Sequence, residues 1–364
     1  MTHPRHFCSI VPPYLLEHLA DTGPADLAAG ARTTLAHDQA LRPARPGARP
    51  AEASSQRPAR DNGTGPNRRV HDAKKATTLP GTLVRAEGAA PTGDRAADEA
   101  YDGLGDTWRL LHDALGRDSL DDRGLGLPAT VHYGRDYLNA FWDGTQMVFG
   151  DGDGDLFVSF TSSLDVIAHE LAHGLTQYTS GLNYSDQSGA LNEHVSDVFG
   201  VVTKQFALGQ TSAEADWLIG AELLGPGVQG VALRSMAAPG TAYDDPRLGK
   251  DPQPATMAHY VDTTDDYGGV HINSGIPNKA FHVLATTLGG HAWEAPLQIW
   301  YDTVTGDIRA DCDFATFAHL TQAAAAARFG EGSPETDALA AAWAAVDVVP
   351  APARQPSRRP AAST

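Results

Sequence analysis

The stretch Val166–Leu175, VIAHELAHGL, constrains the fold more than any other, because it places two histidines four residues apart in an apolar helical pattern. A helix advances about 100° per residue, so His169 and His173 lie on one face and one turn apart. Their imidazoles are then close enough to share one metal ion, and Glu170 projects beside it. The alternative is a polar turn on an apolar helix. A metal centre that acts on a substrate needs a third protein ligand, so a second helix would have to supply one.

A candidate third ligand follows in Gly189–Asp197, GALNEHVSD. Glu193 lies twenty residues after His173, which leaves room for a helix end, a loop and a second helix that packs back against the first. Asp197, four residues after Glu193, falls on the same helical face, where it can accept the outer N–H of a ligating histidine. His194 points about 100° away from Glu193, so we expect it to be a structural or surface histidine.

Two imidazoles and one carboxylate are donors that suit zinc and leave one coordination position open. Glu170, near the metal but not bound to it, is then placed to take a proton from the attacking water. The His-Glu-x-x-His spacing is also a known signature of zinc peptidases. The combination favours metal-assisted hydrolysis over a polar turn.

Composition excludes several other classes of function. The chain has 364 residues, 41% of them apolar, which is enough for two or three domains with a sizeable core. Its net charge of −18 argues against nucleic acid as a partner, because binding phosphates requires a basic surface. No apolar run approaches the ~18 residues that a membrane span needs, and we expect no membrane partner. The N-terminus lacks the apolar segment of a signal peptide, and Cys8 and Cys312 are too few for a disulfide framework.

The N-terminal part of the chain divides into two segments. Residues 1–41 form a small ordered unit, in which Pro12-Pro13-Tyr14 precedes a helical pattern of Leu15, Leu16 and Leu19. Residues 42–69 hold seven arginines against only two acidic residues, among many Pro, Ala, Gly and Ser. This composition is typical of a disordered linker. Such a linker is either an inert spacer or a processing segment between a pro-region and a mature enzyme.

The remaining chain changes from strand-rich to helical. Between Thr77 and Phe160, short apolar runs broken by Gly and Asp indicate strands, with one helix near Asp98–Leu115. Helical periodicity then appears at 163–180, 189–208, 274–289, 292–303, 313–329 and 333–346. The tail, residues 350–364, is rich in Pro and Arg and is expected to be disordered.

Several motifs in combination carry a family resemblance. The stretch HELAHGLTQYTSGLNYSDQSGALNEHVSDVFG, with NAFWDG, ALRSM and GGVHINSG, resembles the thermolysin-like neutral metallopeptidases over about residues 70–346. The Pro-Pro-Tyr segment resembles the protealysin-like branch, whose members carry a short pro-region. The resemblance implies an α+β, two-lobed zincin: pro-region 1–41, linker 42–69 with a processing site, β-rich lobe 70–184 with the zinc-binding helix, helical lobe 185–349 and tail 350–364.

The resemblance also implies an active site. Zinc would bind to His169, His173 and Glu193, with Glu170 as general base and proton shuttle. The residues implied to support these groups or to stabilise the tetrahedral intermediate are His271, Tyr184, Asp266, Asp197 and Asn192. An imidazole poised across from the metal would stabilise the oxyanion, which is usually the largest catalytic effect in acyl transfer.

The same resemblance implies how a peptide substrate binds. Asn139 and Ala140 match an edge segment that pairs with the substrate backbone, as a peptide adds a strand to a sheet. Arg234 matches a residue that bonds a substrate carbonyl. The residues that match the pocket for the side chain after the scissile bond are Phe157, Phe160, Val166 and Leu233. The expected activity is endopeptidase hydrolysis of proteins or peptides before an apolar residue.

The chain departs from the family where thermolysin binds a pair of calcium ions. Asp165 and Asp216 keep matching positions, but Lys204, Leu218 and Ala221 replace expected acidic ligands. A calcium site needs enough oxygen ligands, so we predict that the double site is absent and that Lys204 pairs with Asp165. The run Asp151–Asp155 fails the calcium-loop pattern, and we expect a tight acidic turn there.

Some alternatives stay open. Cys8 is either a thiolate that occupies the open zinc position in the precursor or a buried small apolar residue. Two other functions are a metal-bound interaction protein without activity, which would be expected to have lost Glu170 or His271, and a metallo-aminopeptidase. We expect a monomer whose pro-region acts in cis. The resemblance implies secretion, and the lack of a signal peptide leaves intracellular retention open.

Overall fold

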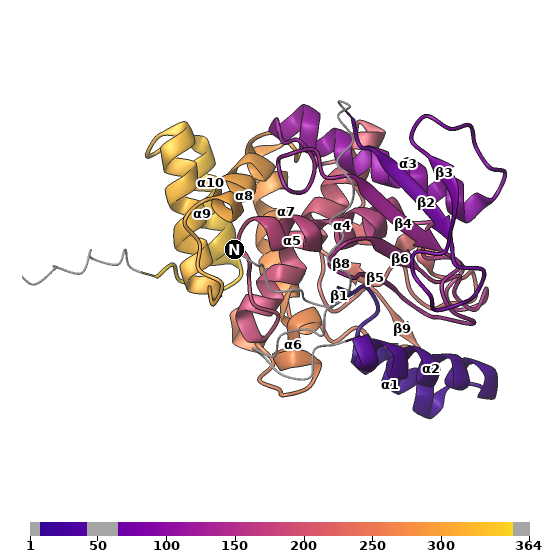
Figure 1. Cartoon of the computed structure of the whole chain (residues 1–364). Helices are drawn as coiled ribbons and strands as arrows, with labels where there is room; N and C mark the ends of the chain where they lie inside the picture. The colour runs from indigo at the N-terminus through magenta and orange to yellow at the C-terminus, as the bar shows by residue number, and fades with distance from the viewer. Residues whose placement is uncertain (1–7, 42–64, 352–364) are drawn as a thin grey trace, which may run out of the picture.

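The computed structural model describes residues 8–41 and 65–351. After a mostly helical N-terminal unit, a β-rich part is followed by a helical part (Figure 1). The main sheet has six strands in the order β1-β5-β6-β4-β2-β3. These strands are β1 (Cys8–Ser9), β2 (Arg68–Asp72), β3 (Thr82–Ala86), β4 (Leu127–Val131), β5 (Ala140–Trp142) and β6 (Met147–Phe149). The β2–β4 and β4–β6 pairs are parallel and the others antiparallel, so the sheet is mixed. Its edge strand β1 comes from the N-terminal segment.

Helix α3 (Arg95–Arg109) packs against strands β2, β3 and β4 of the sheet. The helix begins where the Asp94 side chain accepts a hydrogen bond from Ala97 N–H, and a π-helical turn, η1 (Leu110–Ala114), continues it. This matches the helix predicted near Asp98–Leu115. An Asp at the N-cap satisfies a backbone N–H that the helix itself cannot pair.

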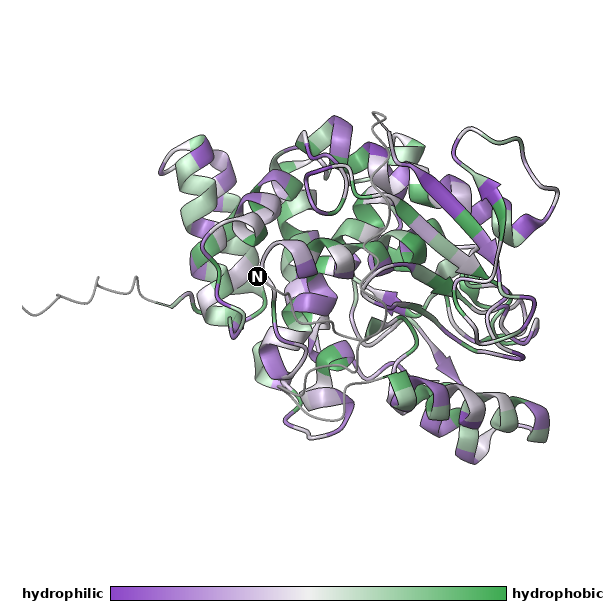
Figure 2. Cartoon of the chain, in the orientation of Figure 1, coloured by the Kyte–Doolittle hydropathy of each residue, from purple (hydrophilic) through white to green (hydrophobic). Residues whose placement is uncertain are grey.

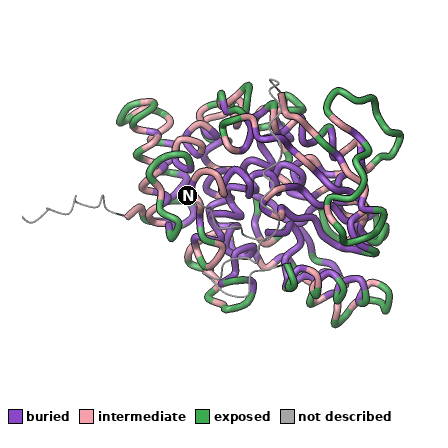
Figure 3. The backbone as a smooth tube through the Cα atoms, in the orientation of Figure 1, coloured by how far each residue is buried: buried purple, intermediate pink, exposed green. Residues whose placement is uncertain are grey.

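The centre of the molecule is a pair of buried helices, α4 (Leu164–Tyr178) and α5 (Asp186–Leu208). Twelve of the fifteen residues of α4 and eighteen of the twenty-three residues of α5 are buried, so both helices are covered on nearly every side. Hydrophobic residues concentrate in this central region (Figure 2), and the buried backbone fills it (Figure 3). Gly200 allows the close approach, because a Cβ there would lie 2.6 Å from the Asp165 carbonyl oxygen.

The later helices confirm the helical periodicity. They are α7 (Gly275–Leu288), α8 (Ala295–Thr305), α9 (Phe314–Phe329) and α10 (Pro334–Ala345). The periodicity did not predict α6 (Asp266–Asn273), because Tyr267, Gly268 and Gly269 adopt left-handed backbone angles inside it. Short elements link α5 to α6: β7 (Leu218–Ile219), η2 (Ala221–Leu223), β8 (Arg234–Ser235), β9 (Asp244–Asp245), β10 (Gly249–Lys250) and η3 (Met257–His259).

The N-terminal unit is a helical hairpin of α1 (Pro13–Thr22) and α2 (Ala25–Leu41). In Figure 1 it lies at the opposite end of the molecule from α9 and α10. Its α2 is tied to the loop before β5: Leu138 N–H donates to Thr34 Oγ1 at 2.9 Å, and Tyr137 O–H donates to Asp38 Oδ1 at 2.5 Å. These buried hydrogen bonds join the N-terminal unit to the rest of the fold.

Two predicted segments lie mostly outside the described residues, namely the linker 42–69 and the tail 350–364. Strand β2 begins at Arg68, so the last two residues assigned to the linker belong to the sheet. None of the helices in the described part of the chain is both long and apolar enough to span a membrane.

Candidate active site

The three predicted metal ligands converge at the contact between α4 and α5. His169 Nε2 and His173 Nε2 lie 3.2 Å apart, and the Glu193 carboxylate lies 3.3 Å from the first and 3.5 Å from the second. One donor atom from each residue fits within a 4.8 Å span, and all three side chains are buried. Two imidazoles and a carboxylate are zinc donors, so this set fits one zinc ion.

Neighbouring side chains fix the orientation of both imidazoles. His169 Nδ1 donates to Asp197 Oδ1 at 2.8 Å, and His173 Nδ1 donates to Asn192 Oδ1 at 2.9 Å. Each ring therefore presents Nε2 to the shared point, where that nitrogen can bind a metal. Asp197 also accepts two hydrogen bonds from Arg234 Nε and a terminal nitrogen, at 3.0 and 2.8 Å. Burial acts to raise the pKa of Asp197, but the nearby Arg234 and His169 outweigh this and lower it.

The histidines differ in their affinity for protons. Burial acts to lower the pKa of His169, but its interactions with Asp197 and Glu193 raise it to about 9. For His173 the effect of burial dominates, and the pKa falls to about 4. Because a ligating histidine is neutral, a metal bound here would displace a proton from a charged His169.

Glu170 lies beside the ligands in a fully buried position. Its Oε2 accepts the Trp142 backbone N–H at 3.1 Å, and its Oε1 has no hydrogen-bond partner among the described residues. Burial raises the pKa of Glu170 well above its ordinary value, and the charge of Glu193 adds to this effect. A carboxylate with a raised pKa and one unpartnered oxygen is suited to accept and return a proton.

His271, on α6, faces the ligands from the other side. Its Nδ1 donates to Asp266 Oδ1 at 2.7 Å, and its backbone N–H donates to Asp266 Oδ2 at 2.8 Å. The Tyr184 hydroxyl donates to Glu193 Oε1 and lies 3.3 Å from His271 Nε2. Burial acts to lower the pKa of His271, but Asp266 and Glu193 raise it. The protonated ring can donate from both nitrogens.

The N-terminal segment reaches into this site. His271 Nε2 donates to the Ser9 carbonyl at 3.0 Å, and Arg234 donates to the Ile10 carbonyl at 3.3 Å. Ile10 N–H in turn donates to the Ala140 carbonyl at 3.2 Å. Two residues predicted to contact substrate, Ala140 and Arg234, therefore contact the chain's own segment.

Asn139 contacts the next residue of that segment. Its Oδ1 accepts Val11 N–H at 2.9 Å, and its Nδ2 donates to the Val11 carbonyl at 3.1 Å. The same amide donates to Asp38 at 3.1 Å. Asn139 thus binds backbone through both polar atoms of its side chain, and its contact with a substrate stays a prediction.

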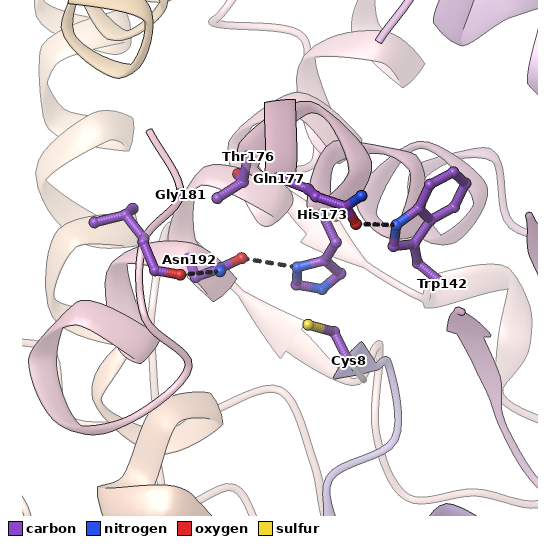
Figure 4. Close-up of a pocket in the computed structure, with 8 residues that line it drawn as sticks. Cys8, Trp142, His173, Thr176, Gln177, Gly181 and Asn192 are labelled. Carbon is purple, nitrogen blue, oxygen red and sulfur yellow. Dashed lines mark hydrogen bonds between the residues drawn. The ribbon is translucent and has the colours of Figure 1, made fainter. Parts of the chain in front are cut away.

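Cys8 lies just before these contacts and is 2% exposed. It lines a pocket with His173, Asn192 and Trp142, and Figure 4 shows its thiol pointing toward His173. The cysteine is buried, and it shares a pocket with a metal ligand. Coordination of zinc by Cys8 stays a prediction.

The four predicted pocket residues are fully or almost fully buried. Phe157 and Phe160 have ring centroids 5.7 Å apart. Ile10 belongs to the same continuous hydrophobic core as the predicted pocket residues Phe157, Phe160, Val166 and Leu233. Their role as a specificity pocket stays a prediction.

Three expectations outside the set of metal ligands are met. Lys204 Nζ lies 3.3 Å from Asp165 and 3.0 Å from Asp216, so the expected ion pair is present. Asp153 Oδ1 accepts the backbone N–H groups of Asp155, Leu156 and Phe157, so the acidic run forms a tight turn with the residues that follow it. His194 is buried and structural, since it bonds Asn278 and Trp300 at 2.7 Å each.

Some supporting residues were missed. Trp142 holds Glu170 through its backbone, and the NAFWDG motif contained it without indicating that role. Asn278 donates to Asp197 at 2.8 Å, and Gln253 donates to the His271 carbonyl at 2.8 Å. Asn278 and Asp197 are 81 residues apart in the sequence, and Gln253 and His271 are 18 residues apart. No local sequence pattern indicates either contact.

Known proteins share this arrangement. Residues 54–177 match the thermolysin metallopeptidase catalytic domain, and residues 180–348 match its alpha-helical domain. An extracellular metalloprotease of Pectobacterium carotovorum is 51% identical over 345 residues, covering 94% of this chain and 97% of that protein. An extracellular minor metalloprotease of Serratia marcescens is 45% identical, covering 79% and 80%. The protealysin precursor of Serratia proteamaculans aligns with a TM-score of 0.84 and 48% identity, covering 94% and 100%. The chain therefore belongs to the thermolysin family of metallopeptidases.

Proposed function

We propose that this chain is a zinc endopeptidase precursor in which His169, His173 and Glu193 hold the metal and Glu170 moves the proton. The observation that carries this proposal is the convergence of three buried donor residues within 4.8 Å, next to the buried Glu170. Zinc held there supplies Lewis-acid polarisation of the scissile carbonyl and lowers the pKa of water.

Glu170 is the proton carrier in this proposal. Trp142 N–H fixes one carboxylate oxygen, which leaves Oε1 to accept a proton from the attacking water. The raised pKa of Glu170 lets it hold that proton until the leaving amine takes it. Asp197 and Asn192 keep the imidazoles in the orientation that the metal requires.

His271 and Tyr184 are the oxyanion donors. Asp266 fixes the His271 ring and supports its protonated form, so that Nε2–H points into the site. Removing a single oxyanion donor typically lowers kcat by about 10² to 10³.

The substrate backbone pairs with Ala140, while Asn139 and Arg234 bond the residues after the scissile peptide. The apolar residues Phe157, Phe160, Val166 and Leu233 supply the pocket, and the preferred residue after the scissile bond is apolar. The contacts of these residues with the N-terminal segment support this assignment. Ala140 and Arg234 bond the backbone of Ile10, and Asn139 bonds the backbone of the next residue, Val11.

We also infer the organisation of the precursor. Residues 1–41 are a pro-region that acts in cis, 42–69 a linker with the processing site, and 70–184 and 185–349 the two catalytic lobes. The family matches break between residues 177 and 180, close to the proposed lobe boundary. The relatives named extracellular support secretion of the mature enzyme. We expect that enzyme to be a monomer.

The test is Glu170→Gln, with the exposed Glu331→Gln as the matched control. Each purified precursor is incubated with zinc, its new N-terminus is sequenced, and a trace of mature wild-type enzyme processes any precursor that stays intact. The processed Glu170→Gln enzyme should bind zinc normally and hydrolyse an internally quenched peptide at least 10² times more slowly. Equal rates for the two variants would contradict the proposal.

A second comparison separates an endopeptidase from an aminopeptidase. The mature enzyme should cleave a peptide with a blocked N-terminus as fast as one with a free N-terminus. A strict requirement for the free amine would favour the aminopeptidase.

A further inference from the structure

The N-terminal segment Cys8–Val11 lies in the cleft as an added strand. Strand β1 pairs antiparallel with β5, with Cys8 opposite Trp142 and Ser9 opposite Phe141. Ile10 N–H continues the ladder to the Ala140 carbonyl. An extended peptide that adds to a sheet edge gains main-chain hydrogen bonds irrespective of its side chains, which is how a protease can hold many substrates.

The register of this strand identifies one peptide bond. Along the segment, the Ser9 carbonyl meets His271, the Ile10 carbonyl meets Arg234, and Val11 meets Asn139. His271 is the proposed oxyanion donor, so the carbonyl that it contacts occupies the reacting position. That carbonyl belongs to the Ser9–Ile10 bond.

The residue after this bond has the expected chemistry. Ile10 is apolar and fully buried, and it belongs to the same core as the proposed pocket residues. The backbone register selects the Ser9–Ile10 bond, and the buried apolar side chain of Ile10 agrees with the proposed preference for an apolar residue after the cut.

We propose that the Ser9–Ile10 bond is a built-in substrate, cut by the active site of the same molecule before the linker is cleaved. This inference rests on the proposed function. Water oxygen bonds to the Ser9 carbonyl carbon, the Ser9–Ile10 C–N bond breaks, and both water protons end on the amino group of Ile10. The products are a Ser9 carboxylate and an Ile10 ammonium.

The cut alone does not empty the cleft. Residues after Ile10 remain anchored, because Asn139 holds Val11 and α2 is tied to the loop before β5 through Thr34 and Asp38. The new ammonium can still donate to the Ala140 carbonyl. The nicked protein is therefore a latent intermediate, and the enzyme becomes active only after the linker is also cut.

The test follows the intact, zinc-loaded precursor by mass spectrometry under denaturing conditions, with N-terminal sequencing. We expect a species that begins at Ile10 to appear before any linker product, with a first-order rate constant that does not change over a hundredfold dilution. Ile10→Asp should slow this cut at least tenfold, because it places a charge at an apolar position, and Ile10→Leu should preserve it.

A second measurement does not depend on how the Ile10→Asp precursor folds. The mature enzyme should cut a blocked synthetic peptide of residues 5–16 between Ser9 and Ile10. If the enzyme cleaves its linker and unrelated peptides while Ser9–Ile10 stays intact in both experiments, the inference is wrong and the proposed function stands. If no peptide of any kind is cleaved, the proposed function itself is wrong, and this inference with it.

Discussion

Two charged clusters join α4 to α5, and they differ in what neutralises them. The metal cluster consists of His169, His173, Glu193 and Asp197. The lysine cluster consists of Asp165, Lys204, Asp216 and Glu222, with Lys204 Nζ 3.0 to 3.3 Å from each carboxylate. The lysine cluster sits at the first turn of α4, and the metal cluster follows one to two turns later.

The difference shows that the same helix pair can require a bound metal ion in one cluster and use a lysine side chain as the cation in the other. In the metal cluster the two imidazoles present nitrogen lone pairs to one point, where a divalent ion can accept them. In the lysine cluster an ammonium occupies the centre of three carboxylates. Burial acts to lower the pKa of Lys204, but Asp165 and its neighbours raise it, so the ammonium stays charged. At this point the cation between the helices is therefore a side chain of the protein itself, the Lys204 ammonium.

Removing zinc should have the largest effect. A chelator should abolish peptidase activity and lower the free energy of unfolding by about 4 kcal/mol, relative to protein in free zinc at a thousand times Kd. Urea unfolding and peptide hydrolysis measure the two effects. Zinc should restore both, and calcium should restore neither, because the lysine cluster already holds its own cation. If calcium alone restored the activity or the free energy of unfolding, the proposed difference between the two clusters would be wrong.

Removing the built-in cation should come next. Lys204→Met leaves the buried Asp165 without its partner and should lower the free energy of unfolding by about 3 kcal/mol. The exposed Lys250→Met is the control and should be nearly neutral. Calcium should stabilise Lys204→Met but not the control, since three carboxylates would then face a vacant centre. A variant that calcium leaves unchanged would show that the cluster cannot accept a divalent ion.

The metal cluster also differs from the rest of the site in how far the sequence predicts it. Helical spacing placed His169, His173, Glu193 and Asp197 on facing surfaces, because regular helices convert spacing into geometry. His271 was found only through a motif resemblance, since the left-handed backbone of residues 267–269 breaks any periodicity. The contact of Ser9 with His271 joins residues 262 apart in sequence, and no local pattern encodes it.

Gly200 tests whether the clusters depend on the same close helix contact. A Cβ at this position would lie 2.6 Å from the Asp165 carbonyl and 3.4 Å from the His169 Cβ, so Gly200→Ala must push the helices apart. We expect a loss of about 1 to 2 kcal/mol in the free energy of unfolding, because overpacking outweighs the higher helix propensity of Ala. Gly227→Ala, where only Arg247 comes within 4 Å, is the control. Zinc affinity, measured by competition with a chelator, should fall in Gly200→Ala alone.

The smallest effect concerns pH and the lysine cluster. Lysine with a raised folded pKa contributes stability that is fully present below its unfolded value of about 10.4 and is lost only above it. The deficit of Lys204→Met should therefore be constant between pH 8 and pH 10. Burial already raises the pKa of Asp165, and loss of Lys204 raises it further, so protonation should stabilise the variant as pH falls. Urea unfolding at pH 5 should show a deficit about 1 kcal/mol smaller than at pH 8. A deficit that grows toward pH 5 would mean that Lys204 is not what keeps Asp165 ionised.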